Sequence, residues 1–168
     1  HFRWDASSDI KMEALTNYMK GVPAIKKVYL INQNYASAEP VRTTARSMLK
    51  AKRPDIEIVG DEKHPLLKVT DFAPYIAKIK ASGADSVVTG NWGTDMSLLI
   101  KAAKDAGLDA NFYTYYAGAN GSPSAIGPMM DGKIKFVYIG HQNIPELAKW
   151  TQEFSAKFKD DLSLLSTL

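Results

Sequence analysis

Hydrophobic positions between residues 70 and 110 alternate between the spacing of an amphipathic helix and that of a short buried strand. Apolar residues first recur three or four positions apart, which predicts a helix that is capped by Thr70 or Asp71 and ends at Gly83. The next apolar run, residues 84–89, is short and contains β-branched residues, so it predicts a strand. A second helical spacing follows. The apolar positions are Phe72, Ile76 and Ile79 in the first helix and Met96, Leu99, Ile100 and Ala103 in the second, which ends at Gly107.

The same alternation continues along the rest of the chain. Further helices are expected over residues 9–19, 39–51, 125–130 and 145–158, and further strands over residues 27–32, 56–60, 111–115 and 134–139. Alternating helices and strands predict the α/β class, with a parallel sheet, right-handed crossovers and helices on both faces, which makes three layers. No internal repeat or interdomain linker interrupts the pattern, so residues 1–168 are expected to form a single α/β lobe.

The composition of the chain excludes some classes of function. The 168 residues are 45% hydrophobic and 23% charged, which fits one globular domain with a core. The net charge is +3, and the 21 Lys and Arg residues are dispersed, so no nucleic-acid partner is expected. Cysteine is absent, which excludes disulfides and thiolate sites. No apolar run reaches the roughly 20 residues of a membrane helix, and the first residues lack the features of a signal peptide, so a processed or excised piece is expected.

Candidate binding residues follow three of the predicted strands. Asn91 and Trp92 are expected to be exposed after strand 84–89, Tyr35 follows strand 27–32, and Tyr115 and Tyr116 follow the fourth strand. Loops at the carboxyl ends of strands in open α/β sheets bind ligands, so these side chains are expected to line one small-molecule cleft. The alternative is structural: Trp92 would pack against a helix N-terminus, and the tyrosines would cover the surface.

The sequence gives little support for a catalytic site or a metal site. His64 and His141 have no partner at a metal-binding spacing and are expected to be loop histidines. The pair Asp61 and Glu62 falls in a predicted loop over residues 61–69, where a solvated turn is favoured over a metal site. No nucleophile elbow or phosphate-binding loop is present. We therefore expect a protein that is not an enzyme, with no catalytic residues, metal or cofactor; an enzyme that uses Asp61, Glu62 or His64 is the remote alternative.

Three segments carry a resemblance to a known family. KKVYLINQNYASAEPV (residues 26–41), the run from HPLLKVTD to KDAGLD (residues 64–109) and FYTYYAG (residues 112–118) resemble the periplasmic substrate-binding proteins of branched-chain amino acid ABC transporters. Such proteins are clamshells of two α/β lobes. The resemblance implies that this chain is the second lobe, that the first lobe is absent, and that a ligand binds in the cleft between the lobes.

The resemblance also bears on individual residues. Tyr35 and Trp92 match positions where the family often has ligand-binding aromatic residues, and Tyr116 occupies the place of an acidic residue that pairs with the ligand's ammonium. A buried ammonium needs a partner. An aromatic or aliphatic carboxylate therefore competes with a branched-chain or other amino acid as ligand, although a cation–π contact of about 0.5 to 2 kcal/mol could still hold ammonium.

The function implied is that of the solute-binding component of an ABC importer, which is periplasmic or lipid-anchored outside the cytoplasm and delivers its ligand to a membrane permease. The alternative is a ligand-sensing effector domain of a receptor or transcriptional regulator, since such proteins reuse the clamshell. The isolated lobe is expected to bind weakly and to form a homodimer at high concentration, because its cleft face is uncovered.

Overall fold

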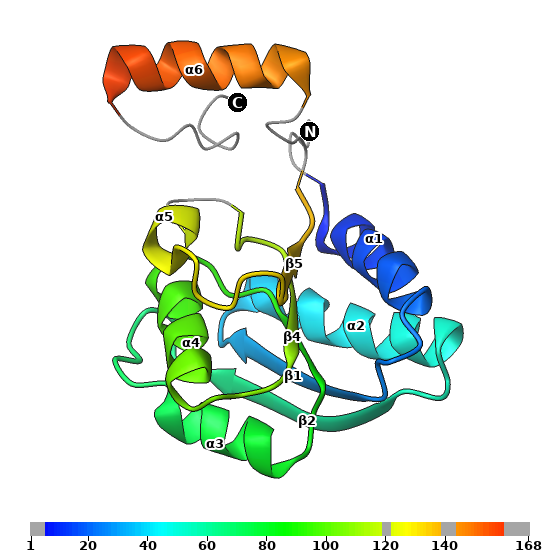
Figure 1. Ribbon diagram of the computed structural model, residues 1–168. Helices are drawn as coiled ribbons and strands as arrows, with labels where there is room; N and C mark the ends of the chain where they lie inside the picture. The colour runs from blue at the N-terminus through cyan, green and yellow to red at the C-terminus, as the bar shows by residue number, and fades with distance from the viewer. Residues whose placement is uncertain (1–5, 119–121, 139–143, 160–168) are drawn as a thin grey trace.

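A parallel five-stranded sheet forms the centre of the computed structural model, which describes residues 6–118, 122–138 and 144–159 (Figure 1). The strand order is β2-β1-β3-β4-β5. The strands are β1 (Lys27–Gln33), β2 (Glu57–His64), β3 (Ser86–Thr89), β4 (Asn111–Thr114) and β5 (Ile134–Phe136). The helices are α1 (Ser8–Lys20), α2 (Glu39–Lys52), α3 (Ala73–Ala81), α4 (Gly93–Asp105), α5 (Ser122–Ile126) and α6 (Pro145–Phe158), with the short 3-10 helix η1 (Ala36–Ala38) before α2.

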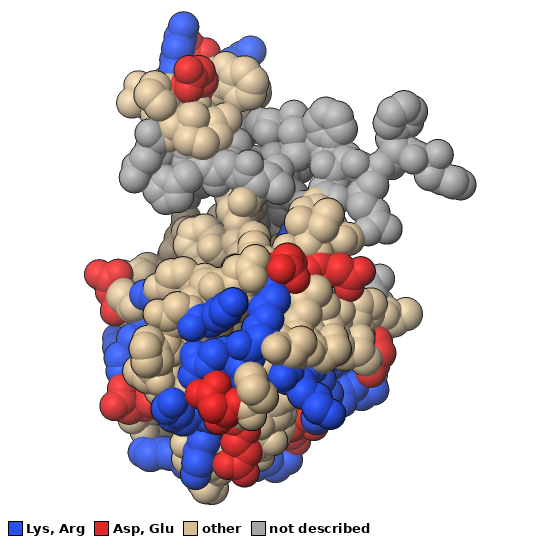
Figure 2. Space-filling view, turned by 90° about the vertical axis from the view of Figure 1, so that its right-hand side faces the viewer, with Lys and Arg blue, Asp and Glu red and all other residues tan. Residues whose placement is uncertain are grey.

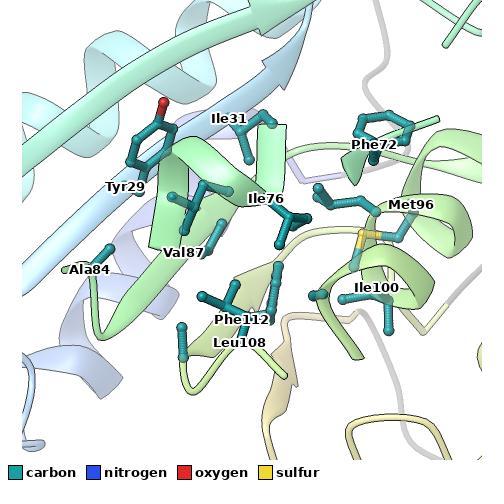
Figure 3. Packing of buried hydrophobic residues seen from close by; sticks show 14 of the residues in the cluster. Tyr29, Ile31, Phe72, Ile76, Ala84, Val87, Met96, Ile100, Leu108 and Phe112 are labelled. Carbon is teal, nitrogen blue, oxygen red and sulfur yellow. The ribbon is translucent and has the colours of Figure 1, made fainter. Parts of the chain in front are cut away.

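Helices cover both faces of the sheet, as expected. Because successive side chains of a strand point to opposite faces, Tyr29 and Ile31 of β1 pack into one core, and Val28 and Leu30 pack into the other. The first core is completed by α3, α4 and α5, and the second by α1 and α2. Figure 3 shows residues of the first core packed together, with Phe112 of β4 among them.

The connections turn in opposite directions from the centre of the sheet. β1 leads through α2 to β2 at one edge, whereas β2 leads through α3 to β3 on the other side of β1. The loop after β1 leads to α2 on one face of the sheet, and the loop after β3 leads to α4 on the other face, so these two loops diverge. A crevice at such a switch point is where open α/β sheets bind ligands.

The longer elements confirm the sequence predictions. Gly83 and Gly107 follow the last residues of α3 and α4 with φ of +70° and +61°, a conformation that favours glycine. The α3 helix begins at Ala73 with Phe72 at the N-cap position, one or two residues later than expected. Asp71 still accepts a hydrogen bond from the Ala73 N–H.

Several boundary predictions are wrong. The strand predicted to end at Gly60 continues to His64, because pairing with β1 extends to the end of both strands. The predicted helix over residues 125–130 is instead the earlier helix α5, since Pro123 suits its first turn and Gly127, with φ of +55°, stops it. Three strands are also shorter than expected at one end, and Ile139, predicted to end the last of them, lies outside the described residues.

Candidate ligand-binding site

Tyr35 and Trp92 meet at the switch point between β1 and β3. Tyr35 lies just beyond β1, and Trp92 is the N-cap residue of α4. The Trp92 indole Nε1–H donates a hydrogen bond of 3.1 Å to the Tyr35 hydroxyl, although the two residues are 57 positions apart. Both side chains are half-buried. The structure thus brings two of the candidate residues together as one partly exposed aromatic pair.

Asn91 is fully buried, so the prediction that it is exposed is wrong. Its side-chain oxygen accepts a hydrogen bond of 3.1 Å from the Gln33 N–H at the end of β1. Its own N–H donates to the Thr89 hydroxyl at 3.0 Å. The backbone at the end of these central strands needs partners away from water, and Asn91 supplies one. Asn91 directly precedes Trp92, so these hydrogen bonds fix the backbone next to the aromatic pair.

His64 is also fully buried, which corrects the prediction of a loop histidine. Its ring packs edge-on against Phe72 with centroids 4.9 Å apart. Its Nε2 lies 2.9 Å from the Asn91 side-chain nitrogen, and its Nδ1 lies 3.2 Å from the Pro65 carbonyl oxygen. Both contacts are hydrogen bonds when Nδ1 carries the proton and Nε2 accepts. His141, the other candidate, lies outside the described residues.

Gln33 and Asp95 complete the buried group. The Gln33 amide donates to Asp95 Oδ2 at 2.7 Å and to the main-chain carbonyl of Trp92 at 3.4 Å. Asp95 is in the first turn of α4, where a helix N-terminus favours a negative charge. It also accepts a bond of 2.8 Å from the Leu67 N–H. We call Gln33, His64, Asn91 and Asp95 the buried polar network; each is no more than 1% exposed.

Sequence reasoning singled out two members of this network but missed Gln33 and Asp95. The sequence did contain a sign of their burial, because both polar residues lie among apolar positions. Asp95 directly precedes Met96 on the apolar face of a helix, and Gln33 ends an apolar strand, where a polar residue that enters the core needs buried partners.

Tyr115 and Tyr116 form a second aromatic group beyond β4. Tyr115 is 1% exposed, and its hydroxyl donates to the Ser8 carbonyl oxygen at 2.7 Å. Burial raises the pKa of Tyr115 well above its usual range. Tyr115 therefore ties β4 to the start of α1. Tyr116 is half-buried, and the Lys11 ammonium lies 3.4 Å from its hydroxyl and 4.6 Å from its ring centroid.

The prediction that Asp61 and Glu62 lie in a loop, in a solvated turn, is wrong. Both residues belong to β2. Asp61 pairs with Arg42 and Arg46 of α2. Burial raises the pKa of Asp61, but hydrogen bonds from the two guanidiniums lower it by more, and the net shift is downward. Glu62 pairs with Lys78 and accepts a hydrogen bond of 3.1 Å from the Tyr29 hydroxyl. Among the described residues no group of three or more metal-ligating side chains is present.

Other charged side chains of the described residues also form ion pairs. Figure 2 shows Lys and Arg side chains interspersed with Asp and Glu on one face of the molecule. The ion pairs of the described residues include those of Lys52 with Glu13 and of Arg53 with Asp55. Within the described ranges, no helix is long and apolar enough to cross a membrane.

An open parallel sheet with an aromatic pair at its switch point is the arrangement expected of an α/β domain that binds a small ligand. Residues 1–165 match the family model described as periplasmic binding protein. The chain therefore belongs to the periplasmic binding protein family. Its fold is that of one lobe of a type I periplasmic binding protein, as the resemblance implied.

Several relatives are similar in sequence or structure. The chain is 37% identical over 135 residues to Leu/Ile/Val-binding protein homolog 4 of Brucella abortus (strain 2308), covering 80% of this chain and 32% of that protein. It is 31% identical to the leucine-, isoleucine-, valine-, threonine- and alanine-binding protein of Brucella ovis in its closed conformation, with a TM-score of 0.80 over 97% of this chain and 42% of that one.

A third similar structure is a solute-binding protein of an ABC transporter from R. palustris in complex with benzoate. Its identity is 22% and its TM-score 0.79, over 93% of this chain and 42% of that chain, and at this identity the likeness shows the fold alone. The chain spans about a third of the length of the curated relatives it matches.

Proposed function

We propose that this chain is the second lobe of a solute-binding protein that captures a small amino acid or related carboxylate for an ABC importer. The complete protein would close two lobes around its ligand and present the closed form to a membrane permease. Membership of the family and the names of the Brucella relatives support this proposal. Family membership also supports a periplasmic location and a role in transport without catalysis.

The observation that carries the proposal is the pair of Tyr35 and Trp92 at the switch point. Two half-buried aromatic rings offer apolar surface with polar edges, which suits a small ligand with an apolar side chain and a polar end. The buried polar network holds the backbone on both sides of Trp92, so the pair is already in place before a ligand arrives. Less ordering on binding means that more of the contact energy appears as affinity.

Closure of the cleft follows from the same contacts. A ligand favours the closed state only by its additional affinity for that state. This lobe would supply Tyr35, Trp92 and Tyr116, and the remaining contacts would come from a first lobe. A single lobe therefore makes only part of the contacts and is expected to bind weakly.

Two ligand classes fit this lobe. Branched-chain amino acids are what the names of the Brucella relatives state for those proteins. Carboxylates without an amine are favoured because the Lys11 ammonium lies 4.6 Å from the Tyr116 ring centroid, on the ring that a ligand ammonium would otherwise contact. The cation–π contact considered for a ligand ammonium is thus already made by a lysine of the protein.

Thermal-shift measurements on the complete protein test the proposal. The panel contains leucine, isoleucine, valine, benzoate and aliphatic 2-oxo acids; a ligand at about 100 times its Kd adds about 2.7 kcal/mol of stability. We expect a clear shift with at least one solute, and the Trp92→Ala variant should lose most of it. Ile10→Ala, which truncates an exposed apolar side chain on α1, is the matched control and should keep the shift.

Absence of any shift across the panel would contradict the proposal. A membrane-spanning segment or a helix-turn-helix in the complete gene product would favour the ligand-sensing alternative instead. These outcomes separate the two functions because they depend on different parts of the complete protein.

A further inference from the structure

We propose that Leu67, an exposed leucine on the loop after β2, is a docking residue that meets the first lobe of the complete protein when the two lobes close. The inference rests on the proposed function and concerns the rim of the cleft, not a contact with the ligand. Three observations carry it: the backbone conformation of Leu67, the exposure of its side chain, and its place in the sheet.

The backbone of Leu67 is strained. Its φ of +51° lies in the left-handed region, which glycine adopts freely and leucine does not. The surrounding structure imposes this conformation, because the Leu67 N–H donates at 2.8 Å to the carboxylate of Asp95, which is 1% exposed. Strain of this kind persists only where neighbouring contacts hold it, and it concentrates at ligand clamps and switch regions.

This conformation presents a large apolar side chain to solvent. Leu67 is 49% exposed. A Cβ placed on Gly93 would lie 4.0 Å from Leu67 Cδ2, so the leucine lies over the start of α4, next to the residue that follows Trp92. An exposed leucine is ordinary on a protein surface, but a leucine that is both strained and exposed is not explained by the packing of its own lobe.

Leu67 lies at the edge of the sheet where closure moves this lobe most. The strand order β2-β1-β3-β4-β5 makes β2, which precedes Leu67, and β5 the two opposite edges. The chain passes from the sheet to α6 after β5, and no residue of α6 is buried. Figure 1 shows α6 standing apart from the sheet beyond β5, with β2 on the far side. A hinge at the β5 edge carries the β2 edge through the longest path, which puts Leu67 at the mouth of the cleft.

The occupant that this position favours is the first lobe. This chain covers 42% of the Brucella ovis protein whose structure shows the closed conformation, so more than half of that protein corresponds to nothing in this chain. Leu67 follows the carboxyl end of its strand, as Tyr35 does, and therefore faces the same side as the cleft. Apolar surface that leaves water only in the closed state favours that state, because it contributes nothing to the open one.

Calorimetric titration of the complete protein tests the inference. The probe is whichever of leucine, isoleucine, valine, benzoate or the aliphatic 2-oxo acids gives the largest thermal shift. Leu67→Asn removes the apolar side chain and keeps the backbone conformation, since asparagine tolerates positive φ. We expect the dissociation constant to rise about fivefold, because half of a leucine side chain no longer leaves water on closure. The urea midpoint of the unliganded protein should not fall.

Two further variants separate docking from a general effect on the fold. Leu67→Met keeps an apolar side chain of similar volume and should hold the dissociation constant within about twofold of wild type. Tyr18→Asn makes the same kind of change at an exposed residue near the other end of α1 and should leave the dissociation constant unchanged. Circular dichroism confirms that each variant is folded before its affinity is compared.

The outcomes distinguish this inference from the proposed function. An unchanged dissociation constant in Leu67→Asn, or an equal loss in Leu67→Met, would overturn the inference while leaving solute binding intact. Unchanged affinity with impaired uptake in reconstituted vesicles would assign Leu67 to the permease, and a dimer that Leu67→Asn dissociates in sedimentation would assign it to a second copy; both would overturn docking on the first lobe. Binding of no solute in the panel would overturn the proposed function and the inference with it.

Discussion

Replacement of Asp95 by alanine should release the segment that follows β2. The Asp95 carboxylate is 1% exposed and accepts from the Gln33 amide at 2.7 Å and from the Leu67 N–H at 2.8 Å. Leu67 has φ of +51°, a left-handed conformation that costs a non-glycine residue roughly 1–2 kcal/mol. The hydrogen bond to Asp95 therefore holds a strained residue in place.

The size of the effect can be worked out from these contacts. A buried donor left without a partner costs about 1–3 kcal/mol. The Gln33 donor is buried and the Leu67 donor is partly buried, so Asp95→Ala should destabilise the protein by about 3 kcal/mol in total, of which about 1.5 kcal/mol falls on the segment that contains Leu67. Each 1.4 kcal/mol is a factor of ten, so the Leu67 amide should exchange with solvent about tenfold faster.

Hydrogen–deuterium exchange of peptides that span residues 65–69 measures this directly. Asp95→Asn keeps an acceptor oxygen and should show a much smaller increase in exchange. Asp131→Ala removes an exposed carboxylate that accepts from the Gly132 N–H, and it should leave residues 65–69 unaffected. Unchanged protection of Leu67 in Asp95→Ala would refute the reasoning, because the segment would then be held by other contacts.

Three further predictions concern the sheet, its charges and the isolated chain. Gly60→Ala should lower the stability measured by urea denaturation by about 1–3 kcal/mol, because the added Cβ would overlap the Tyr29 ring. Gly21→Ala is the control and should be nearly neutral, because its added Cβ would meet only a carbonyl oxygen at 3.5 Å. Asp61→Asn should lower the free energy of unfolding at neutral pH. This difference from wild type should disappear as pH falls below about 4, through the lowered folded-state pKa of Asp61. A difference in stability that persists in acid would count against the ion pairs. The isolated chain should self-associate at high concentration, since α6 exposes Trp150 and Phe158, and a monomer in sedimentation throughout the accessible concentration range would contradict this.

The fold was largely predictable from the sequence because most elements carry a strong period or a clear stop. The apolar positions of α4 and the glycines after α3 and α4 are examples. The end of β2 was missed because charged Asp61 and Glu62 resemble a loop. Their partners, Arg42 and Lys78, lie on helices distant in the sequence, and only the folded sheet brings these ion pairs together.

The site was predictable only in part. The position of Tyr35 and Trp92 after central strands follows from the order of elements, but the hydrogen bond between them depends on β1 and β3 being neighbours. Asn91 and His64 look like loop residues in a sequence because polar residues favour the surface. Asn91 is hydrogen-bonded both to the Gln33 N–H and to His64, and these long-range contacts, which no local pattern contains, satisfy the buried polar groups.

A crystal structure of the complete protein with a bound solute tests the central claim most directly. We expect a ligand between two lobes, in contact with the Tyr35 and Trp92 rings. A ligand bound away from the carboxyl ends of β1 and β3, with Tyr35 and Trp92 facing solvent, would contradict it.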